Sequence, residues 1–121
     1  MRVRRPVISV EVLEDAAVIR FDGTIEIFHA DQIRRTAVDL IEGQGLRSLV
    51  FSLCGVTSVA SSAFGVFLTL MQSYRHTVQF RFCCLSEQVQ SVFAAARLYD
   101  FFPVDPDVDS SLQVVRSQPA V

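Results

Sequence analysis

The chain carries little excess charge of either sign. Its 121 residues include 11 arginines and no lysine against 13 aspartates and glutamates, which gives a formal net charge of −2. Proteins that bind nucleic acid without sequence preference normally present a basic face, and this balance argues against one. Arg2, Arg4 and Arg5 form a basic concentration at the start of the chain, but three charges make a weak electrostatic footprint. We therefore expect no nucleic-acid partner.

Cysteine is also scarce, with three residues in the chain. Cys54, Cys83 and Cys84 match neither an even disulfide framework nor the ligand spacing of a zinc site. Cys83 and Cys84 are adjacent within an apolar, strand-like run, where at least one of them should behave as a small buried hydrophobe. This usage is typical of a protein that works in a reducing cytoplasm.

No hydrophobic run is long enough to cross a bilayer. The most apolar window, residues 59–71, is interrupted by serines and is shorter than a membrane span. The arginines at the start are followed by Pro6 and an alternating segment instead of the apolar core of a signal peptide. We expect a soluble, cytoplasmic protein that does not insert into a membrane directly.

Sequence patterns that carry catalysis are missing as well. The chain has no glycine-rich phosphate loop, no nucleophile elbow, no paired carboxylates on a helix and no metal-ligand spacing. His29 and His76 have no acid or nucleophile at a readable spacing, so we interpret both as capping or surface residues. We expect no cofactor, no metal and no enzymatic activity.

What the chain does contain is an alternation of strands and helices. Half of its residues are hydrophobic and a fifth are charged, and a chain of 121 residues can bury about two-thirds of its unfolded surface. Apolar runs and alternations predict strands, and apolar residues three or four positions apart predict helices. The predicted strands are 6–13, 16–21, 46–53, 77–85 and 98–104, and the predicted helices are 30–41, 61–74, 86–96 and 107–115.

This order predicts an α/β fold with a mixed, mostly parallel sheet that is entered by a β-hairpin and accompanied by about four helices. Gly43 and Gly45 are placed to end the first helix, and Ser86 is placed to cap the third. No repeat, linker or low-complexity segment divides the chain. We expect a single domain over residues 1–121, with a frayed tail from about Arg116.

The most informative segment is the pair Ser61-Ser62, which opens an apolar helix shortly after a strand. A serine at Ser61 can cap the helix, which is worth about 1 kcal/mol. It can also accept a phosphate, which would lie on the helix N–H groups and add about two negative charges to a surface that docks a partner. Phe64 lies on the same first turn, where we expect exposure beside Ser61 and weigh a docking contact against ordinary packing.

Residues 49–66, LVFSLCGVTSVASSAFGV, resemble the core of the STAS domain family, in which an apolar strand and a loop lead to Asp-Ser-Ser/Thr-Gly-Leu-Gly-Val at the next helix. Residues 21–26 are similar to the family's Gly-x-Leu-Asp after the second strand, and residues 92–102 to its helix before Gly-Leu-x-x-x-Phe. The resemblance covers nearly the whole chain. The departures are Ala60 and Ser52 where the family often has Asp, Ala63 where it has Gly, and Glu26 in place of Asp.

Within the family the chain looks like an anti-sigma factor antagonist. This resemblance implies a bacterial transcription regulator that binds an anti-sigma factor serine kinase and is switched off when the kinase phosphorylates Ser61. It makes Ser61 the phosphoacceptor and adds Glu26 and, more weakly, Ser62 to the partner-binding residues. Because Ala60 replaces the family's carboxylate, two alternatives stay open: an accessory STAS subunit of a membrane transport system, and a binding module that is never phosphorylated.

Overall fold

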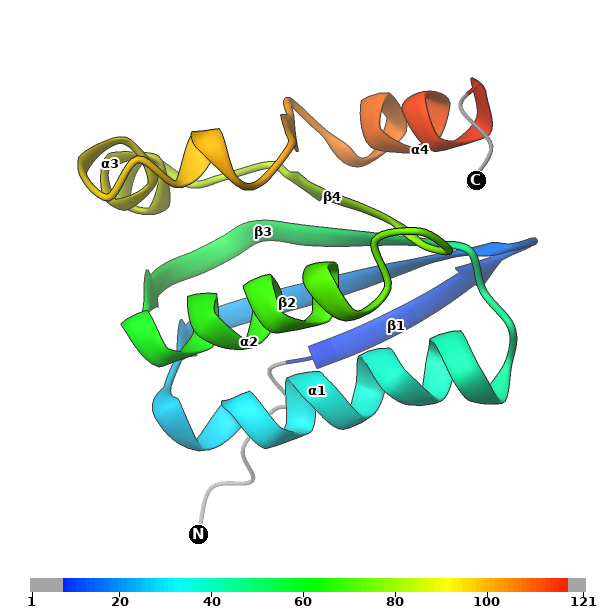
Figure 1. Ribbon diagram of the computed structural model, residues 1–121. Coiled ribbons are helices and arrows are strands. Elements are labelled where there is room, and N and C mark those ends of the chain that lie inside the picture. Colours follow the sequence, from blue (N-terminus) through cyan, green and yellow to red (C-terminus); the bar gives the residue numbers. More distant parts are fainter. Residues whose placement is uncertain (1–7, 118–121) are drawn as a thin grey trace, which may run out of the picture.

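A five-stranded sheet in the order β1-β2-β3-β4-β5 organises the chain, as the computed structural model in Figure 1 shows for residues 8–117. The strands are β1 (Ile8–Leu13), β2 (Ala16–Ile25), β3 (Ser48–Val59), β4 (Gln79–Cys83) and β5 (Val104–Asp105). The helices are α1 (Ala30–Val38), α2 (Ser61–Ser73), α3 (Glu87–Ala95) and α4 (Val108–Ser117), with 3₁₀ turns η1 (Ile27–His29) and η3 (Leu98–Asp100) and a π turn η2 (Asp39–Gly43). Within this described part of the chain, no helix has the length and apolar character that a bilayer crossing needs.

The sheet is parallel except at its first strand. β1 pairs antiparallel with β2 through a tight turn in which Glu14 takes a left-handed φ of 61°. β2, β3, β4 and β5 pair in parallel, and a helix lies in each connection between them. Parallel neighbours need such a crossover, because a short turn can only reverse the chain. The predicted mixed sheet with its entering hairpin is therefore confirmed.

Alternating side chains along the strands divide the core into two layers. Ala17, Ile19 and Phe21 of β2 face one layer with α1, α2 and α3, whereas Ala16 and Val18 face the layer beneath α4. In Figure 1, α1 and α2 lie on one side of the sheet and α4 on the other. Both faces of the central strand β3 are thus covered, which explains its nearly continuous apolar sequence.

Phenylalanine rings fill the larger layer. The ring of Phe67 in α2 meets those of Phe51 in β3 and Phe82 in β4 edge-on, with 5.0 Å between ring centroids in both pairs. All three side chains are buried. Edge-to-face contacts of this kind add to the free energy gained from burial, so they fix α2 firmly on the sheet.

The two strands β2 and β3 extend further than the sequence predicted. The second strand was expected to end at residue 21, but the chain continues to Ile25 while Gly23 takes a φ of +75° and the register shifts. A glycine at positive φ can absorb such an irregularity without ending the ladder. β3 likewise runs to Val59, so both strands deliver their following loops to the same edge.

The last third of the chain also differs from the prediction. The expected strand over 98–104 is the turn η3 followed by the two-residue strand β5, because Arg97 takes a left-handed φ of 58° after α3 and bends the chain. The tail was expected to fray from Arg116, but α4 continues through Ser117. Residues 118–121 of the expected tail lie outside the described residues.

The three cysteines match no disulfide framework in the sequence, but two of them are bonded in the structure. A disulfide joins Cys54 in β3 to Cys84 directly after β4, with 4.7 Å between the two Cα atoms. The residues are 30 positions apart in sequence, and the parallel pairing of β3 with β4 brings them together. Cys83 is a free thiol with no exposed surface, as expected for one cysteine of the adjacent pair.

Ser86 caps α3 as predicted and also ties it to the sheet. Its Oγ accepts a hydrogen bond from the Val89 N–H at 3.3 Å and donates one to the Val56 carbonyl at 2.5 Å.

Ser86→Ala should therefore lower the free energy of unfolding by about 1–2 kcal/mol, measured by urea denaturation. Ser91→Ala is the matched control on the same helix, because the exposed Ser91 hydroxyl bonds only the Glu87 carbonyl of its own helix. An equal loss in both variants would contradict the double role of Ser86.

Candidate functional site

The candidate site lies where β2 and β3 end, at one edge of the parallel part of the sheet. Glu26 follows β2 directly, and Ser61 follows β3 after a single residue. The Ala60 N–H donates to the Ile25 carbonyl at 2.8 Å and so joins the two loops. In Figure 1, α1 and α2 begin at this same edge of the sheet. The carboxyl ends of parallel strands are the usual place for binding sites in α/β folds.

Ser61 does not cap α2, so the capping interpretation is wrong. Ala60 occupies the N-cap position in an extended conformation, with φ −67° and ψ 141°, and its side chain accepts no hydrogen bond. Ser61 is the first helical residue and is exposed, as is Ser62. Within residues 8–117, no group hydrogen-bonds the Ser61 hydroxyl. The first turn thus presents a free hydroxyl on a helix end whose N–H groups no side chain satisfies.

Glu26 opens the turn η1, and His29 closes it. The Glu26 N–H donates to Nδ1 of His29 at 2.8 Å, and the His29 N–H donates to the Glu26 carbonyl at 3.0 Å. The expected capping role of His29 is therefore confirmed. The side chain of Glu26 is exposed at the same edge as Ser61. This closed turn fixes the direction of the two residues between Glu26 and His29.

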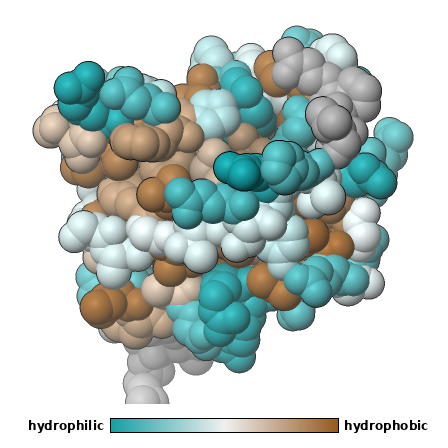
Figure 2. Space-filling model, viewed as in Figure 1, coloured by the Kyte–Doolittle hydropathy of each residue, from teal (hydrophilic) through white to brown (hydrophobic). Residues whose placement is uncertain are grey.

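Those two residues, Ile27 and Phe28, form an apolar projection that the sequence analysis missed. Their exposed fractions are 69% and 63%, which makes them the most exposed large hydrophobic residues in the described part of the chain. Figure 2 shows the hydrophobic surface at the lower left, over the turn between β2 and α1. A signal did exist: Ile25 already turns inward at the strand end, and a tight turn cannot bury two further consecutive apolar residues. Apolar side chains held out by a closed turn are typical of a protein-binding surface.

Phe64 is not exposed beside Ser61, so the expectation of an exposed side chain there is wrong. It is 9% exposed and packs edge-on against Phe93 of α3, with 5.6 Å between centroids, and beside Phe102 at 6.3 Å. The helix α3 covers the side of the first turn on which Phe64 lies. A partner could not reach this ring, so Phe64 belongs to the core and not to a docking surface.

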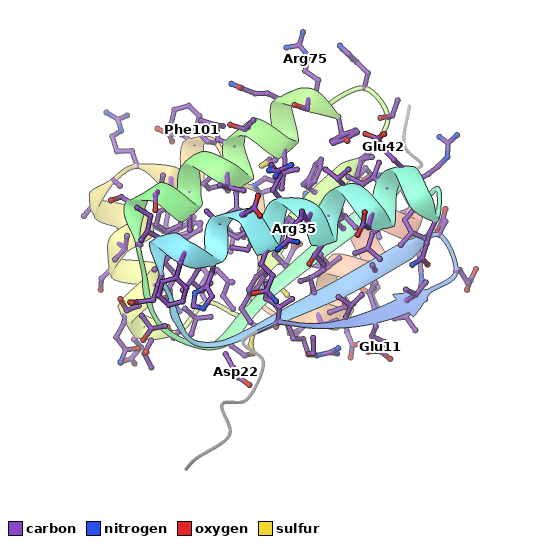
Figure 3. The ribbon with its side chains drawn as sticks, turned by 90° about the horizontal axis from the view of Figure 1, so that it is seen from below. Glu11, Asp22, Arg35, Glu42, Arg75 and Phe101 are labelled. Atoms are coloured by element: carbon purple, nitrogen blue, oxygen red, sulfur yellow. A yellow bond between two sulfur atoms is a disulfide. The ribbon has the colours of Figure 1, made fainter. Side chains whose placement is uncertain are left out.

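Ser62 faces a groove between α1 and α2 of about 480 Å³. The residues that line this groove are Arg34, Val38, Ser62, Gly65, Val66, Thr69, Leu70, Ser73 and Tyr74. Asp31 forms ion pairs with both Arg34 and Arg35, and the hydrogen bond from Arg34 lowers the pKa of the Asp31 carboxyl. Figure 3 shows Arg35 on the outward side of α1. Both arginine side chains are more than half exposed, so they form a solvated face of α1.

A second polar cluster lies on the opposite face of the sheet, beneath α4. Arg81 of β4 donates two hydrogen bonds of 2.8 Å to the carboxylate of Asp105, and Ser111 of α4 donates a third at 2.6 Å. The bonds from Arg81, together with that from Ser111, lower the pKa of Asp105, and burial opposes them. Burial raises the pKa of the neighbouring Cys83 thiol. This cluster joins β4, β5 and α4 and has a structural role.

Residues 8–117 contain no group of three or more histidine, cysteine, aspartate or glutamate side chains that could hold a metal ion. The site at the strand ends contains the hydroxyl of Ser61, the carboxylate of Glu26 and the apolar projection of Ile27 and Phe28. Such a set can bind a protein surface, and the hydroxyl can be modified.

Comparison with known families decides the family. A sequence model described as the STAS domain matches residues 7–111. The chain belongs to the STAS domain family. The predicted STAS fold is thereby confirmed, with its five-stranded mixed sheet and four helices.

Solved structures show the same fold in proteins of different roles. An anti-sigma factor antagonist from Mycobacterium paratuberculosis is similar to this STAS domain with a TM-score of 0.77 at 19% identity, over 90% of this chain and 92% of that one. The Bacillus cell fate determinant SpoIIAA in its phosphorylated form gives a TM-score of 0.68 at 18% identity, over 88% and 98%. The murine anion transporter Solute Carrier 26 family member A9 gives 0.72 at 12% identity, over 89% of this chain but 19% of the transporter.

Proposed function

We propose that this STAS domain is a non-enzymatic, protein-binding regulator of the anti-sigma factor antagonist type that acts in the bacterial cytoplasm. The observation that carries the proposal is the exposed, unbonded Ser61 hydroxyl at the same strand-end edge as the Ile27–Phe28 projection. The family match and the similarity to anti-sigma factor antagonists support it. The partner would be an anti-sigma factor with serine kinase activity, whose capture releases a sigma factor.

Ser61 would be the phosphoacceptor in this mechanism. The kinase would supply ATP, magnesium and the base that takes the hydroxyl proton, and the Ser61 Oγ would take the transferred phosphoryl group. The N–H groups and the positive dipole end of α2 would stabilise the phosphate. About two negative charges would then stand at the edge where Glu26 already places one, and a partner docked on Ile27 and Phe28 would be repelled.

A second candidate function is an accessory role in a membrane transport system. The similarity of this STAS domain to about a fifth of an anion transporter supports it. A third is a constitutive binder, which Ala60 supports because the N-cap position before Ser61 holds no carboxylate. In these two functions the projection of Ile27 and Phe28 would still bind a protein, but Ser61 would not be modified.

Phosphorylation is tested by incubating the chain with ATP and a candidate anti-sigma factor serine kinase, followed by mass spectrometry of the tryptic peptides. The expected result is one phosphate on Ser61, which is absent from Ser61→Ala and present in the matched control Ser62→Ala. Ser61→Asp should weaken the complex at least tenfold, because it places a permanent charge at the helix end. The constitutive binder would be favoured if Ser61→Asp binds the partner as tightly as the unaltered chain does and the unaltered chain gains no phosphate.

The projection is tested separately from the serine. Phe28→Ala should weaken partner binding about 30-fold, as the loss of a central aromatic contact does, while the melting temperature stays unchanged. Phe101→Ala is the matched control, because Phe101 is 57% exposed and lies on the side of α2 away from α1 (Figure 3). Equal affinities of Phe28→Ala and the unaltered chain, measured by titration calorimetry, would remove η1 from the interface.

A further inference from the structure

β3 and β4 separate after their last paired residues, so the sheet is open between the two strands from that point. The parallel ladder of these strands ends at Ser52 and Cys83, although β3 continues for seven residues to Val59. Over that extension β3 pairs with β2 on one side, while its other edge has left the ladder with β4. Among the described residues 8–117, two side-chain links cross the opening: the disulfide between Cys54 and Cys84, and the hydrogen bond from Ser86 to the Val56 carbonyl. These links hold the β4–α3 loop against β3.

The disulfide is accessible from one side. Cys54 is exposed, whereas Cys84 is half-buried, takes a left-handed φ of 59° and donates its N–H to the Asp105 carbonyl at 3.2 Å. An incoming thiolate can therefore reach Sγ of Cys54 more readily than Sγ of Cys84. The third cysteine, Cys83, is fully buried. It cannot exchange with the bond while the domain is folded.

The bond also closes a covalent ring around the candidate site. Residues 54–84 form this ring, which contains the end of β3, the N-cap Ala60, Ser61, the whole of α2, and β4. Breaking the disulfide opens the ring and leaves Ser86 as the remaining side-chain link across the opening. The redox state of two cysteines thus bears on the segment that carries Ser61.

We propose that Cys54 and Cys84 form a reversible redox pair, a modification site for low-molecular-weight thiols and disulfides that sets how firmly the β4–α3 loop is held to β3. The proposal rests on the proposed cytoplasmic function, because disulfides of cytosolic proteins are usually transient and redox-sensing. The exposure of Cys54 fits such a role, since a structural disulfide gains from being shielded.

A monothiol can reduce the disulfide between Cys54 and Cys84 in two exchange steps. Its thiolate attacks Sγ of Cys54, the bond between the two cysteines breaks, and Cys84 leaves as a thiolate that takes a proton. A second monothiol then displaces Cys54 from the mixed disulfide, which gives the Cys54 thiol and the disulfide of the monothiol. Two electrons pass from two thiols to the protein, and the two protons end on Cys54 and Cys84. Oxidation by the small disulfide runs through the same steps in reverse.

The test equilibrates the purified full chain with mixtures of reduced and oxidised glutathione, followed by acid quenching, alkylation and intact mass measurement. The expected result is a single transition in which two thiols appear together, in the folded chain, within the range that glutathione mixtures span. Cys83→Ala should keep this transition, and Cys54→Ser and Cys84→Ser should each abolish it. Cys83 should react with the alkylating reagent after unfolding only.

A second measurement follows the loop itself. Reduction should lower the melting temperature by about 10 °C, because the ring of residues 54–84 no longer restricts the unfolded chain. The amides of α3 should exchange hydrogen faster in the reduced chain, and Cys54→Ser should show the fast exchange in either redox state. Ser91→Ala, which alters α3 without touching either link, should leave the response to reduction unchanged.

Two results would overturn the proposal. One is a bond that persists in the folded chain under a large excess of reduced glutathione, which would make it a structural disulfide. The other is a reduced chain that does not re-form the bond in oxidised glutathione. Neither measurement uses ATP or a protein partner, so an unphosphorylated Ser61 or a missing partner would contradict the proposed function and leave the redox result standing.

Discussion

Phe64→Ala should lower the free energy of unfolding by about 3 kcal/mol and the melting temperature by about 10 °C. The ring of Phe64 is 9% exposed and lies between α2 and α3, against Phe93 and Phe102. Its removal leaves a cavity where the first turn of α2 meets α3, and the surrounding rings cannot close it without moving a helix. Urea denaturation followed by circular dichroism measures the loss.

The matched control for this substitution is again Phe101→Ala, which removes the same side chain from an exposed position. It should change the free energy of unfolding by no more than about 0.5 kcal/mol. Partner binding by Phe64→Ala, measured well below its melting temperature, should stay close to that of the unaltered chain. Weakened binding without a loss of stability would mean that Phe64 is a surface contact after all.

Asp105→Asn should cost about 2 kcal/mol at neutral pH, because it leaves the half-buried Arg81 guanidinium without its counter-charge. The Arg81 and Asp105 side chains are 21% and 10% exposed, so water cannot replace the lost interaction fully. The control is Asp100→Asn, whose ion pair with Arg97 lies between side chains that are 60% and 84% exposed. An exposed pair of this kind contributes about 0–1 kcal/mol, so the two variants should differ clearly.

The same carboxylate predicts a pH dependence. The hydrogen bonds from Arg81 hold the pKa of Asp105 below its unfolded value. A group with a lowered folded pKa stabilises the fold fully above its unfolded pKa of about 4, and this contribution is lost as pH falls through the folded pKa. The advantage of the unaltered chain over Asp105→Asn should therefore be constant above about pH 5 and shrink in acid. If the free energies of unfolding of the unaltered chain and Asp105→Asn differ equally at pH 7 and in acid, the charge of Asp105 does not contribute to stability.

Much of the fold could be read from the sequence because local patterns and tertiary packing agree. The run 46–53 is apolar at nearly every position, and β3 is covered on both faces. Ser86 caps α3 as its position predicted. The position of Ser61 at the strand-end edge follows from the order of strand, short connection and helix, which fixes that edge in any parallel sheet.

The remaining features depend on contacts between segments that are distant in sequence. Phe64 seemed exposed because its own helix cannot reveal that α3 covers it. Cys54 and Cys84 gave no recognisable spacing, since their proximity comes from the register of β3 against β4. The capping interpretation placed Ser61 at the N-cap, whereas the structure places Ala60 there and Ser61 one residue later. This difference of one position decides whether the Ser61 hydroxyl is bonded or free.

The register of the central strand also has a consequence for folding. Ala16 pairs with Ser48, and Ser48 pairs in turn with Gln79, so β3 joins its two neighbours through loops that each include a whole helix. The hairpin of β1 and β2 closes through a tight turn, but it joins the rest of the sheet only when β3 pairs with β2. Loop-closure entropy must be overcome twice before the core gains from burial, which slows folding relative to a helical bundle. We therefore expect the docking of β3 to set the folding rate of this domain.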